Sequence, residues 1–357
     1  MRDFFDAEAQ KRLYLIRRVS SLYEAAGFRP LLTPALERYS VLTKKGVGGI
    51  AGEIFKIENA DIALRFDLTV PLVRFYAEHR DLKLPLMRYQ IQPVWRREEP
   101  QRKRYREFLQ ADIDIIGGKE PWADIYVIET LLRVLDDLGV EVSAVLLNSR
   151  RALVDVPDEV LRLVDKLDKQ SLERVRAEAD EKGLRKQFDE FLKSTPAYSD
   201  TFYAIVDHLK ARGWPVRIEK TMVRGLNYYS GVIFEVKMKG ESLTIAAGGR
   251  YDRLLKIFGI NSVGAVGGSI GIERIFETIE WRAPRPVFVA WKDVYDYALE
   301  VARKLGVAVF PDNNLKKALA YVKENDRVII VGPREKERRT YIEKDLRTGE
   351  QVERPLD

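Results

Sequence analysis

The pattern of apolar residues changes at a proline-bounded stretch, and this change constrains the fold more than any other feature. The stretch is WRAPRP, residues 281–286. After it, VFVAW, DVYDYALEVARKL, VAVF, LKKALAYVKEN and RVIIVG alternate as strand, helix, strand, helix and strand, which is typical of a small α/β domain. A domain takes roughly 150 residues, so the 357-residue chain has room for a larger part before this stretch. We therefore predict a small α/β domain over 284–357.

The larger part mixes helical and strand patterns. Residues 28–37 read as extended, because Pro30 and Pro34 keep their preceding residues out of the α region. Helices are predicted over 7–26 and 123–138, strands at 62–65, 87–95, 109–116, 231–237 and 243–247, and a glycine-rich strand followed by a helix at 263–280. The mixture predicts an α+β fold.

Two further segments complete the predicted organisation. Residues 151–212 are highly charged and helical, without strand patterns, and are interpreted as a helical insertion. The main domain would then consist of residues 1–150 and 213–283. In the C-terminal tail, the Thr348–Gly349 turn predicts a hairpin or edge strands.

Composition excludes several classes of chemistry. The chain has no Cys, so disulfides, iron–sulfur clusters, thiolate zinc sites and thiol catalysis are ruled out. Its two histidines, His79 and His208, are far apart in sequence, which argues against a histidine metal site or a Ser-His triad. We find neither a run of about 18 apolar residues nor a signal-peptide pattern, so a cytoplasmic protein without a membrane segment is expected. The net charge of +6 is a mild indication of an anionic partner.

The densest charged segment is WRREEPQRKRYREF, from Trp95 to Phe108. Between Arg96 and Glu107 it holds six basic and three acidic residues, and strand patterns flank it. One interpretation is a solvated hairpin. The other is that some of its arginines face a phosphate, which a guanidinium binds with two parallel hydrogen bonds while keeping its charge. The segment alone favours the hairpin.

Three later segments carry glycines or tyrosines in unusual patterns. VRGLNYYSGVIFE pairs two tyrosines before an apolar strand, so one ring can pack in the core while the other lines a site. AAGGRYDRLL places Arg250 and Asp252 beside glycines that allow close approach of a ligand or form a simple hairpin turn. In GGSIGIERIFE, glycines allow close packing and Arg274 begins a helix.

Nucleotide-binding loops of the common kinds are not supported. The sequence contains no G-x-x-x-x-G-K-[ST] motif, which excludes a P-loop. Residues 46–51, GVGGIA, fit the dinucleotide spacing but follow a helical, Lys-rich segment, so we interpret them as a loop.

Taken in order, these motifs resemble those of class II aminoacyl-tRNA synthetases, and within that class the histidyl-tRNA synthetases. GFRPLLTPALE is similar to motif 1, with Pro34 at the dimer interface, WRREEPQRKRYREFLQADIDIIG to motif 2, and GGSIGIER to motif 3. RGLNYYSG and AAGGRYD resemble the two histidine-specific motifs. The resemblance covers nearly the whole chain. It implies an antiparallel sheet flanked by helices, a helical insertion and an anticodon-binding-like C-terminal domain that is shorter than usual.

The resemblance also implies an activity: ATP-dependent activation of histidine to histidyl-adenylate, followed by transfer to the 3′ end of histidine tRNA. Arg96 would bind the α-phosphate of ATP and the carboxylate region of the amino acid. Glu98 and Arg274 would hold the adenine end and the γ-phosphate. Arg224 would be a catalytic cation at the α-phosphate, beside the bound histidine. Mg²⁺ would enter with ATP, with no metal site formed by the protein alone.

The remaining implied roles concern the amino acid and the tRNA. The residues assigned to the histidine ammonium group are Asp67, Thr69 and Gln110, and those assigned to the imidazole are Asp114, Tyr228 and Tyr229. A neutral imidazole offers one donor and one acceptor, which a carboxylate and a phenol can both satisfy. The residues expected at the tRNA acceptor end are Gln101, Arg104 and Arg106. A homodimer through motif 1 is implied as well.

The chain departs from the family pattern at three positions, with Phe66 in place of the usual Pro, Lys103 in place of Gly and Asn227 in place of Asp. Three alternatives stay open. The first is a non-catalytic histidine-sensing paralogue that resembles the regulatory subunit of ATP phosphoribosyltransferase, against which Arg224 and the tail at 284–357 both argue. The others are a synthetase for another amino acid and an RNA-binding module without catalysis.

Overall fold

The structure, a computed structural model, describes residues 2–44, 51–97, 105–168, 170–223, 228–240, 243–322 and 325–356. The chain divides into two compact units, Met1–Trp281 and Arg282–Asp357. The division falls at the start of the proline-bounded stretch, where the apolar pattern changes. Each unit has its own sheet and its own buried core.

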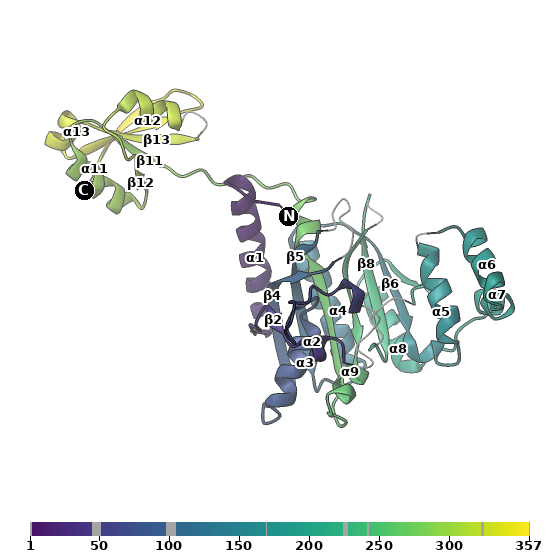
Figure 1. Cartoon of the computed structure of the whole chain (residues 1–357). Helices are drawn as coiled ribbons and strands as arrows, with labels where there is room; N and C mark the ends of the chain where they lie inside the picture. The colour runs from purple at the N-terminus through teal and green to yellow at the C-terminus, as the bar shows by residue number, and fades with distance from the viewer. Residues whose placement is uncertain are drawn as a thin grey trace. The chain divides into compact units, whose positions relative to one another are not determined.

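The first unit is built on an eight-stranded sheet (Figure 1). In spatial order its strands are β1 (Arg29–Pro30), β4 (Leu86–Trp95), β5 (Glu107–Ile116), β10 (Ala265–Gly271), β9 (Thr244–Arg250), β8 (Val232–Met238), β6 (Val142–Ser149) and β7 (Val216–Ile218). The two outermost pairs, β1–β4 and β6–β7, are parallel, and all pairs between them are antiparallel. The predicted α+β fold with an antiparallel sheet is confirmed.

Helices cover both faces of this sheet. Apolar side chains on one face pack with α1 (Ala7–Ala25), α4 (Trp122–Asp137), α8 (Asp200–Ala211) and α10 (Ile272–Phe276) into the larger core. On the other face, α3 (Thr69–Glu78) and α9 (Asp252–Ile257) form a second core with Tyr228 and Tyr251. The second core covers only part of its face, and the polar side chains described below lie on that same face.

Short elements complete the connections near motif 1. They are β2 (Leu36–Glu37), α2 (Tyr39–Leu42), the 3-10 helix η1 (Ala51–Glu53) and β3 (Ala63–Leu64). Strands β2 and β3 pair antiparallel as a small separate sheet, and Lys56 bridges to Ala63 beside it. Residues 45–50, most of the GVGGIA segment, lie outside the described residues.

The segment predicted as an insertion is helical over its described residues. Its elements are η2 (Arg150–Leu153), α5 (Asp158–Asp165), η3 (Lys166–Asp168), α6 (Leu172–Glu181), α7 (Arg185–Lys193) and α8. Helices α5 to α7 share an apolar core of their own and lie past the β6 side of the sheet (Figure 1). Helix α8 belongs instead to the larger core, because Phe202, Ile205 and Leu209 pack with α4.

The second unit is a five-stranded sheet with three helices among its described residues. The spatial order is β12 (Ala308–Val309), β11 (Phe288–Trp291), β13 (Arg327–Val331), β14 (Thr340–Asp345) and β15 (Gln351–Pro355). The helices are α11 (Tyr295–Leu305), α12 (Leu315–Tyr321) and α13 (Pro333–Arg338). The first three strands are parallel, as the strand–helix alternation predicts, and β14 and β15 form the predicted tail hairpin.

Across the described ranges of both units, we find no helix that combines the length and the apolar character needed to span a bilayer.

Candidate active site

Strand β5 carries three polar side chains on the open face of the large sheet. Leu109, Ala111, Ile113 and Ile115 point into the larger core. The alternate residues Gln110, Asp112 and Asp114 therefore point to the opposite face, because successive side chains of a strand alternate. All three are buried all the same, with at most 8% of their surface exposed.

Cross-strand register extends this polar face into three rows. Asp114 lies between Arg88 of β4 and Gly267 of β10, and Asp112 lies between Gln90 and Ser269. The third row consists of Gln92, Gln110 and Gly271. Gly267 is needed for space, because a Cβ there would clash with the Asp114 carboxylate. The floor of the candidate site is thus a buried polar patch beside glycine backbone.

Both oxygens of Asp114 have partners inside the protein. Its Oδ2 forms an ion pair of 2.6 Å with Nη2 of Arg88, whose side chain is also buried. Its Oδ1 accepts a hydrogen bond from the Tyr251 hydroxyl. A carboxylate has about four lone-pair positions, so Asp114 can still accept from a ligand while these contacts fix its orientation.

Gln110 connects Arg96 to Asp112. The Gln110 Oε1 accepts from Arg96 Nη2 at 3.3 Å, and the Gln110 Nε2 donates to the Asp112 carboxylate at 3.2 Å. Arg96 also donates from Nε to the Phe66 carbonyl at 3.2 Å and lies over the Phe108 ring. These contacts hold the Arg96 guanidinium at the edge of the polar floor.

Asp67 precedes α3 and faces the same floor. Its Oδ1 accepts from the Val70 amide at 3.1 Å, and its Oδ2 accepts from the Tyr228 hydroxyl at 3.2 Å. Tyr228 also shares a side-chain hydrogen bond with Thr69 and is buried in the second core. Tyr229 is only half-buried and its ring lies 5.2 Å from that of Tyr228. One tyrosine therefore packs inside while its neighbour stays accessible, as the paired sequence predicts.

Arg274 reaches the site from α10. Its side chain packs along Gly271, the strand partner of Gln110, and it donates to the carbonyl of Thr244. The Thr244 hydroxyl donates to the buried Glu235 carboxylate at 2.6 Å, and Lys237 pairs with the same carboxylate at 2.9 Å. Arg274 thus brings a cation close to the Gln110 row.

Burial makes the carboxylates of the floor weak acids. It raises the pKa of Asp67 to about 7, although the Val70 amide and Arg96 act in the opposite direction. It also raises the pKa of Asp114 to about 7 against the effect of Arg88, and it raises the pKa of Asp112. Mutual repulsion among the three carboxylates adds to these shifts. A cationic ligand would relieve that repulsion.

This predicts a dependence of stability on pH. The folded protein binds a proton at Asp67 with a pKa of about 7, against 3.8 ordinarily, so the unfolded chain loses that proton first as pH rises. The contribution of Asp67 to the free energy of unfolding therefore falls between about pH 4 and pH 7, by at most about 1.4 kcal/mol per pH unit. Urea unfolding between pH 5 and 8 should show a shallower fall in Asp67→Asn, which keeps an oxygen for the Val70 amide.

Asp136→Asn, on the exposed side of α4, is the control for this experiment and should retain the wild-type slope. Identical slopes for Asp67→Asn and the wild type below pH 7 would contradict the raised pKa.

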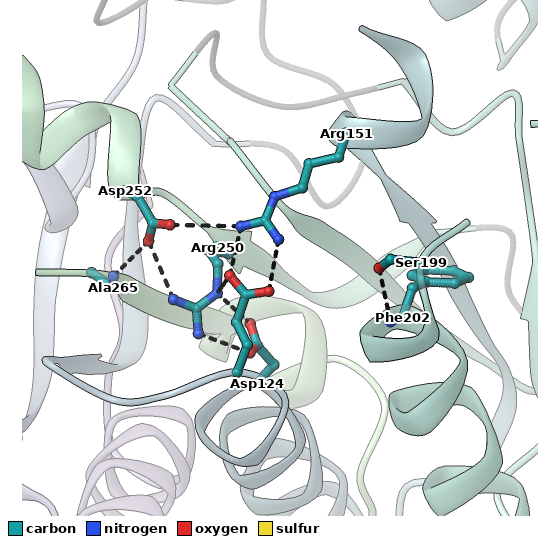
Figure 2. A network of polar contacts seen from close by, with 8 residues as sticks. Asp124, Arg151, Ser199, Phe202, Arg250, Asp252 and Ala265 are labelled. Carbon is teal, nitrogen blue, oxygen red and sulfur yellow. Dashed lines mark hydrogen bonds and ion pairs between the residues drawn. The ribbon is translucent and has the colours of Figure 1, made fainter. Parts of the chain in front are cut away.

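A second polar network is centred on Arg250 (Figure 2). Arg250, at the end of β9, donates to both Asp124 oxygens at 3.0 and 2.8 Å and to Asp252 at 3.2 Å. Asp252 in turn accepts from the Ala265 amide at 2.8 Å. From η2, Arg151 reaches Glu120, which also lies 3.2 Å from Arg250. Arg250 is therefore surrounded by carboxylates and is a structural cation.

The Arg250 backbone connects this network to the segment that follows Tyr228 and Tyr229. Its carbonyl accepts from the Ser230 amide at 2.8 Å, and a Cβ at Gly231 would press against the Arg250 side chain. The next residue, Tyr251, holds Asp114. The glycines of AAGGRYD lie inside β9, so the simple-turn interpretation of that segment is wrong.

Loss of Arg250 should strongly destabilise the first unit. Arg250→Met would leave the fully buried Asp124 without its cation, and breaking a buried pair in this way costs about 3–5 kcal/mol. Arg151→Met removes a half-exposed cation from the same network and should cost about 0–1 kcal/mol. Urea unfolding of both variants at pH 7 measures the difference, and equally small losses would show that Arg250 is not the structural cation.

Several predicted site residues lie outside the described ones: Glu98, Gln101, Arg104, Arg224, and the departures Lys103 and Asn227. The two ends of the motif 2 segment are described. The Arg96 amide donates to the Arg106 carbonyl at 2.8 Å, and the Tyr105 hydroxyl donates to Glu277. The predicted residues that the structure does bring together are Asp67, Thr69, Arg96, Gln110, Asp114, Tyr228 and Tyr229, with Arg274 beside the Gln110 row.

The sequence analysis missed Arg88 and Tyr251 as parts of the site. The alternating run QADIDII places Asp112 on the same strand face as Gln110 and Asp114, the pattern of a strand that lines a cleft, but the sequence assigns Asp112 no role. MRYQIQ alternates in the same way, which places Arg88 on the polar face of its strand. Nothing in the sequence alone indicated that Tyr251 reaches Asp114, 137 residues away. Among the described residues, no group of three or more acidic or histidine side chains is arranged to hold a metal ion.

Comparisons with known proteins agree on one family. A family model described as histidyl-tRNA synthetase matches residues 1–275. A protein of Pyrobaculum neutrophilum named histidine–tRNA ligase is 31% identical over an alignment that covers 100% of this chain and 96% of that protein. One of Aeropyrum pernix with the same name is 36% identical, covering 85% and 81%. A crystal structure of histidyl-tRNA synthetase from Nostoc sp. PCC 7120 matches with a TM-score of 0.81 at 26% identity, covering 100% and 96%.

Proposed function

This chain belongs to the histidyl-tRNA synthetase family, and from that premise we propose how its residues divide the work of the reaction. It is an aminoacyl-tRNA synthetase, a histidine–tRNA ligase, whose substrates are histidine, ATP and tRNA. In the first step, an oxygen of the histidine carboxylate attacks the α-phosphorus of ATP and pyrophosphate leaves. In the second, a hydroxyl at the 3′ end of the tRNA attacks the activated carbonyl and AMP leaves.

Asp67, Thr69 and Gln110 hold the ammonium group of histidine in this proposal. The supporting observation is the buried polar floor, where carboxylates with raised pKa face one another. An incoming ammonium group supplies the positive charge that keeps them ionised. The Gln110 oxygen has a second lone pair beyond its bond from Arg96 and can accept from the same group.

Asp114 and Tyr229 recognise the imidazole. Asp114 is rigidly oriented by Arg88 and Tyr251, so it presents a fixed acceptor to one ring N–H. Tyr229 is half-buried beside the floor, and Tyr228 supports it from behind while bonding to Asp67. A pocket of this kind rejects amino acids that leave its buried polar groups unpaired.

Arg96 is proposed to bind the α-phosphate of ATP, and Arg274, together with Glu98, to hold the γ-phosphate and the adenine end. Arg224 is proposed as a further cation at the α-phosphate, and both Glu98 and Arg224 lie outside the described residues. Mg²⁺ enters as part of the ATP substrate. The Phe66 carbonyl, Gln110 and the Phe108 ring hold Arg96 in place before the reaction. A cation preorganised in this way stabilises the charge that grows on the α-phosphate as the carboxylate attacks.

The decisive experiment is histidine-dependent exchange of labelled pyrophosphate into ATP, with the other nineteen amino acids tested in parallel. Exchange with histidine alone supports the proposed pocket. Arg96→Ala should lower the exchange rate about 100- to 1000-fold, the usual cost of one preorganised electrostatic group. Arg133→Ala, an exposed arginine on α4, is the control and should exchange at the wild-type rate. A rate for Arg96→Ala close to the wild type would remove Arg96 from the site.

We also propose that the chain forms a homodimer through motif 1. Four apolar side chains around the small β2–β3 sheet are exposed: Leu32 (76%), Leu36 (48%), Ile57 (41%) and Ile62 (38%). The Ile57 amide bonds to the Ile62 carbonyl, so these two belong to the hairpin beside β3. A cluster of this kind next to Pro34 fits a self-complementary interface.

Sedimentation velocity tests the dimer. The wild-type chain should sediment as a dimer at micromolar concentration, whereas Leu36→Asp should shift it toward the monomer by placing a charge in the apolar contact. Leu299→Asp, at a similarly exposed leucine (43%) of α11, should leave the dimer intact. A wild-type monomer, or a Leu36→Asp dimer of unchanged stability, would contradict this interface.

The tRNA contacts are proposed from charge and position. Gln101, Arg104 and Arg106 belong to the motif 2 segment, whose described end at Arg106 pairs with the backbone of Arg96. The acceptor end must reach the adenylate, so a basic segment that starts at the phosphate-binding arginine is suited to meet it. We propose the C-terminal unit as the anticodon-binding-like domain and the cytoplasm as the place of action.

A further inference from the structure

Asp112 is a buried carboxylate at the centre of the floor to which neither the family resemblance nor the proposal above gives a role. Only 3% of its surface is exposed. Both of its oxygens lie within reach of Gln110 Nε2, at 3.2 and 3.4 Å, and it has a side-chain hydrogen bond with Ser269. Its contacts therefore connect β5, through Gln110, with β10, through Ser269.

These contacts decide which way the Gln110 amide faces. A side-chain amide has an accepting oxygen at one end and a donating NH₂ at the other. Arg96 can only donate, so it selects the oxygen, and an ionised Asp112 can only accept, so it selects the NH₂. The two neighbours fix the same orientation from opposite sides. If Asp112 were protonated, one oxygen would still be free to accept from Gln110.

We propose that Asp112 is a positioning residue that keeps the Gln110 oxygen turned toward the ammonium group of the bound amino acid. Without it, the Gln110 NH₂ keeps only the longer contact of 3.4 Å with the Ser269 hydroxyl, and the amide is held by Arg96 from the other side at 3.3 Å. The amide is then less firmly held and can turn its NH₂ toward the ammonium group, where donor would meet donor. The consequence is selective: ligands that carry an α-ammonium group lose affinity, and ligands without one do not. This inference rests on the proposed role of Gln110 at the ammonium group.

The test compares two inhibitors that differ in the group at issue. Histidinol keeps the ammonium group and lacks the carboxylate, whereas 3-(imidazol-4-yl)propionate keeps the carboxylate and lacks the ammonium group. In pyrophosphate exchange, Asp112→Ala should raise the Ki of histidinol about tenfold and leave the Ki of imidazolylpropionate within about twofold. A merely structural role would weaken both inhibitors together.

A double-mutant cycle with Gln110→Ala identifies the route of the effect, because residues that act through one another are not additive. Once Gln110 is truncated, Asp112→Ala should change the Ki of histidinol by less than about twofold. A full tenfold loss in the Gln110→Ala background would overturn the inference, because Asp112 would then act independently of that amide.

Two further variants keep the test decisive if Asp112→Ala does not fold. Asp112→Ser is polar but too short to reach the Gln110 NH₂, so it should behave as Asp112→Ala does. Asp112→Asn retains an accepting oxygen at the same length and should keep the Ki of histidinol within about threefold of the wild type. Equal values of the histidinol Ki in the Ser and Asn variants would overturn the inference.

The Gln110→Ala single variant distinguishes a failure of the proposed Gln110 role from a failure of the inference about Asp112. If it leaves histidinol affinity unchanged, the proposed role of Gln110 at the ammonium group fails, and the inference fails with it. If Gln110→Ala weakens histidinol and the Asp112 variants do not, only the inference about Asp112 is overturned.

Discussion

The alternation of β5 is the constraint on which the rest of the site depends. One side of this strand must be apolar to close the larger core against α1 and α4, so its polar side chains are all directed to the other side. Gln110, Asp112 and Asp114 are consequently packed at a spacing of two residues in a place that water scarcely reaches. Three carboxyl groups, counting Asp67, then share one small volume, and burial together with mutual repulsion opposes their ionisation.

The neighbouring elements supply the counter-charge, the space and the hydrogen-bond donors that these buried carboxyl groups require. Strand β4 supplies Arg88 as a buried counter-charge, and β10 supplies Gly267 where a side chain would collide with the Asp114 carboxylate. Tyr228 and Tyr251 donate hydroxyl groups from the second core, and the Arg250 network fixes the backbone that carries Tyr251. In the proposed function, the ammonium group of histidine is the cation that completes this charge balance.

Much of this was predictable from sequence, and the limits have physical causes. The sequence predicts the long elements with clear periods close to their observed bounds. These elements are α1, α4, β4, β5 and the alternating C-terminal strands and helices. Strand β7 is three residues long, too short to show a period of two. The apolar residues of β6 lie mainly in one short run, 144–147, which also lacks that period, so neither strand is predicted. The family resemblance singles out Asp67, Arg96, Gln110 and Asp114. The contacts of Asp114 with Arg88 and Tyr251 depend on strand pairing that a linear sequence does not display.

The most direct test of the account is a crystal structure of this chain with histidine bound. The account predicts the ammonium group against Asp67 and the Gln110 oxygen, the imidazole between Asp114 and Tyr229, and the carboxylate on the side of Arg96. Histidine bound away from the β5 floor, or bound with its imidazole at Asp67 and its ammonium group at Asp114, would contradict it.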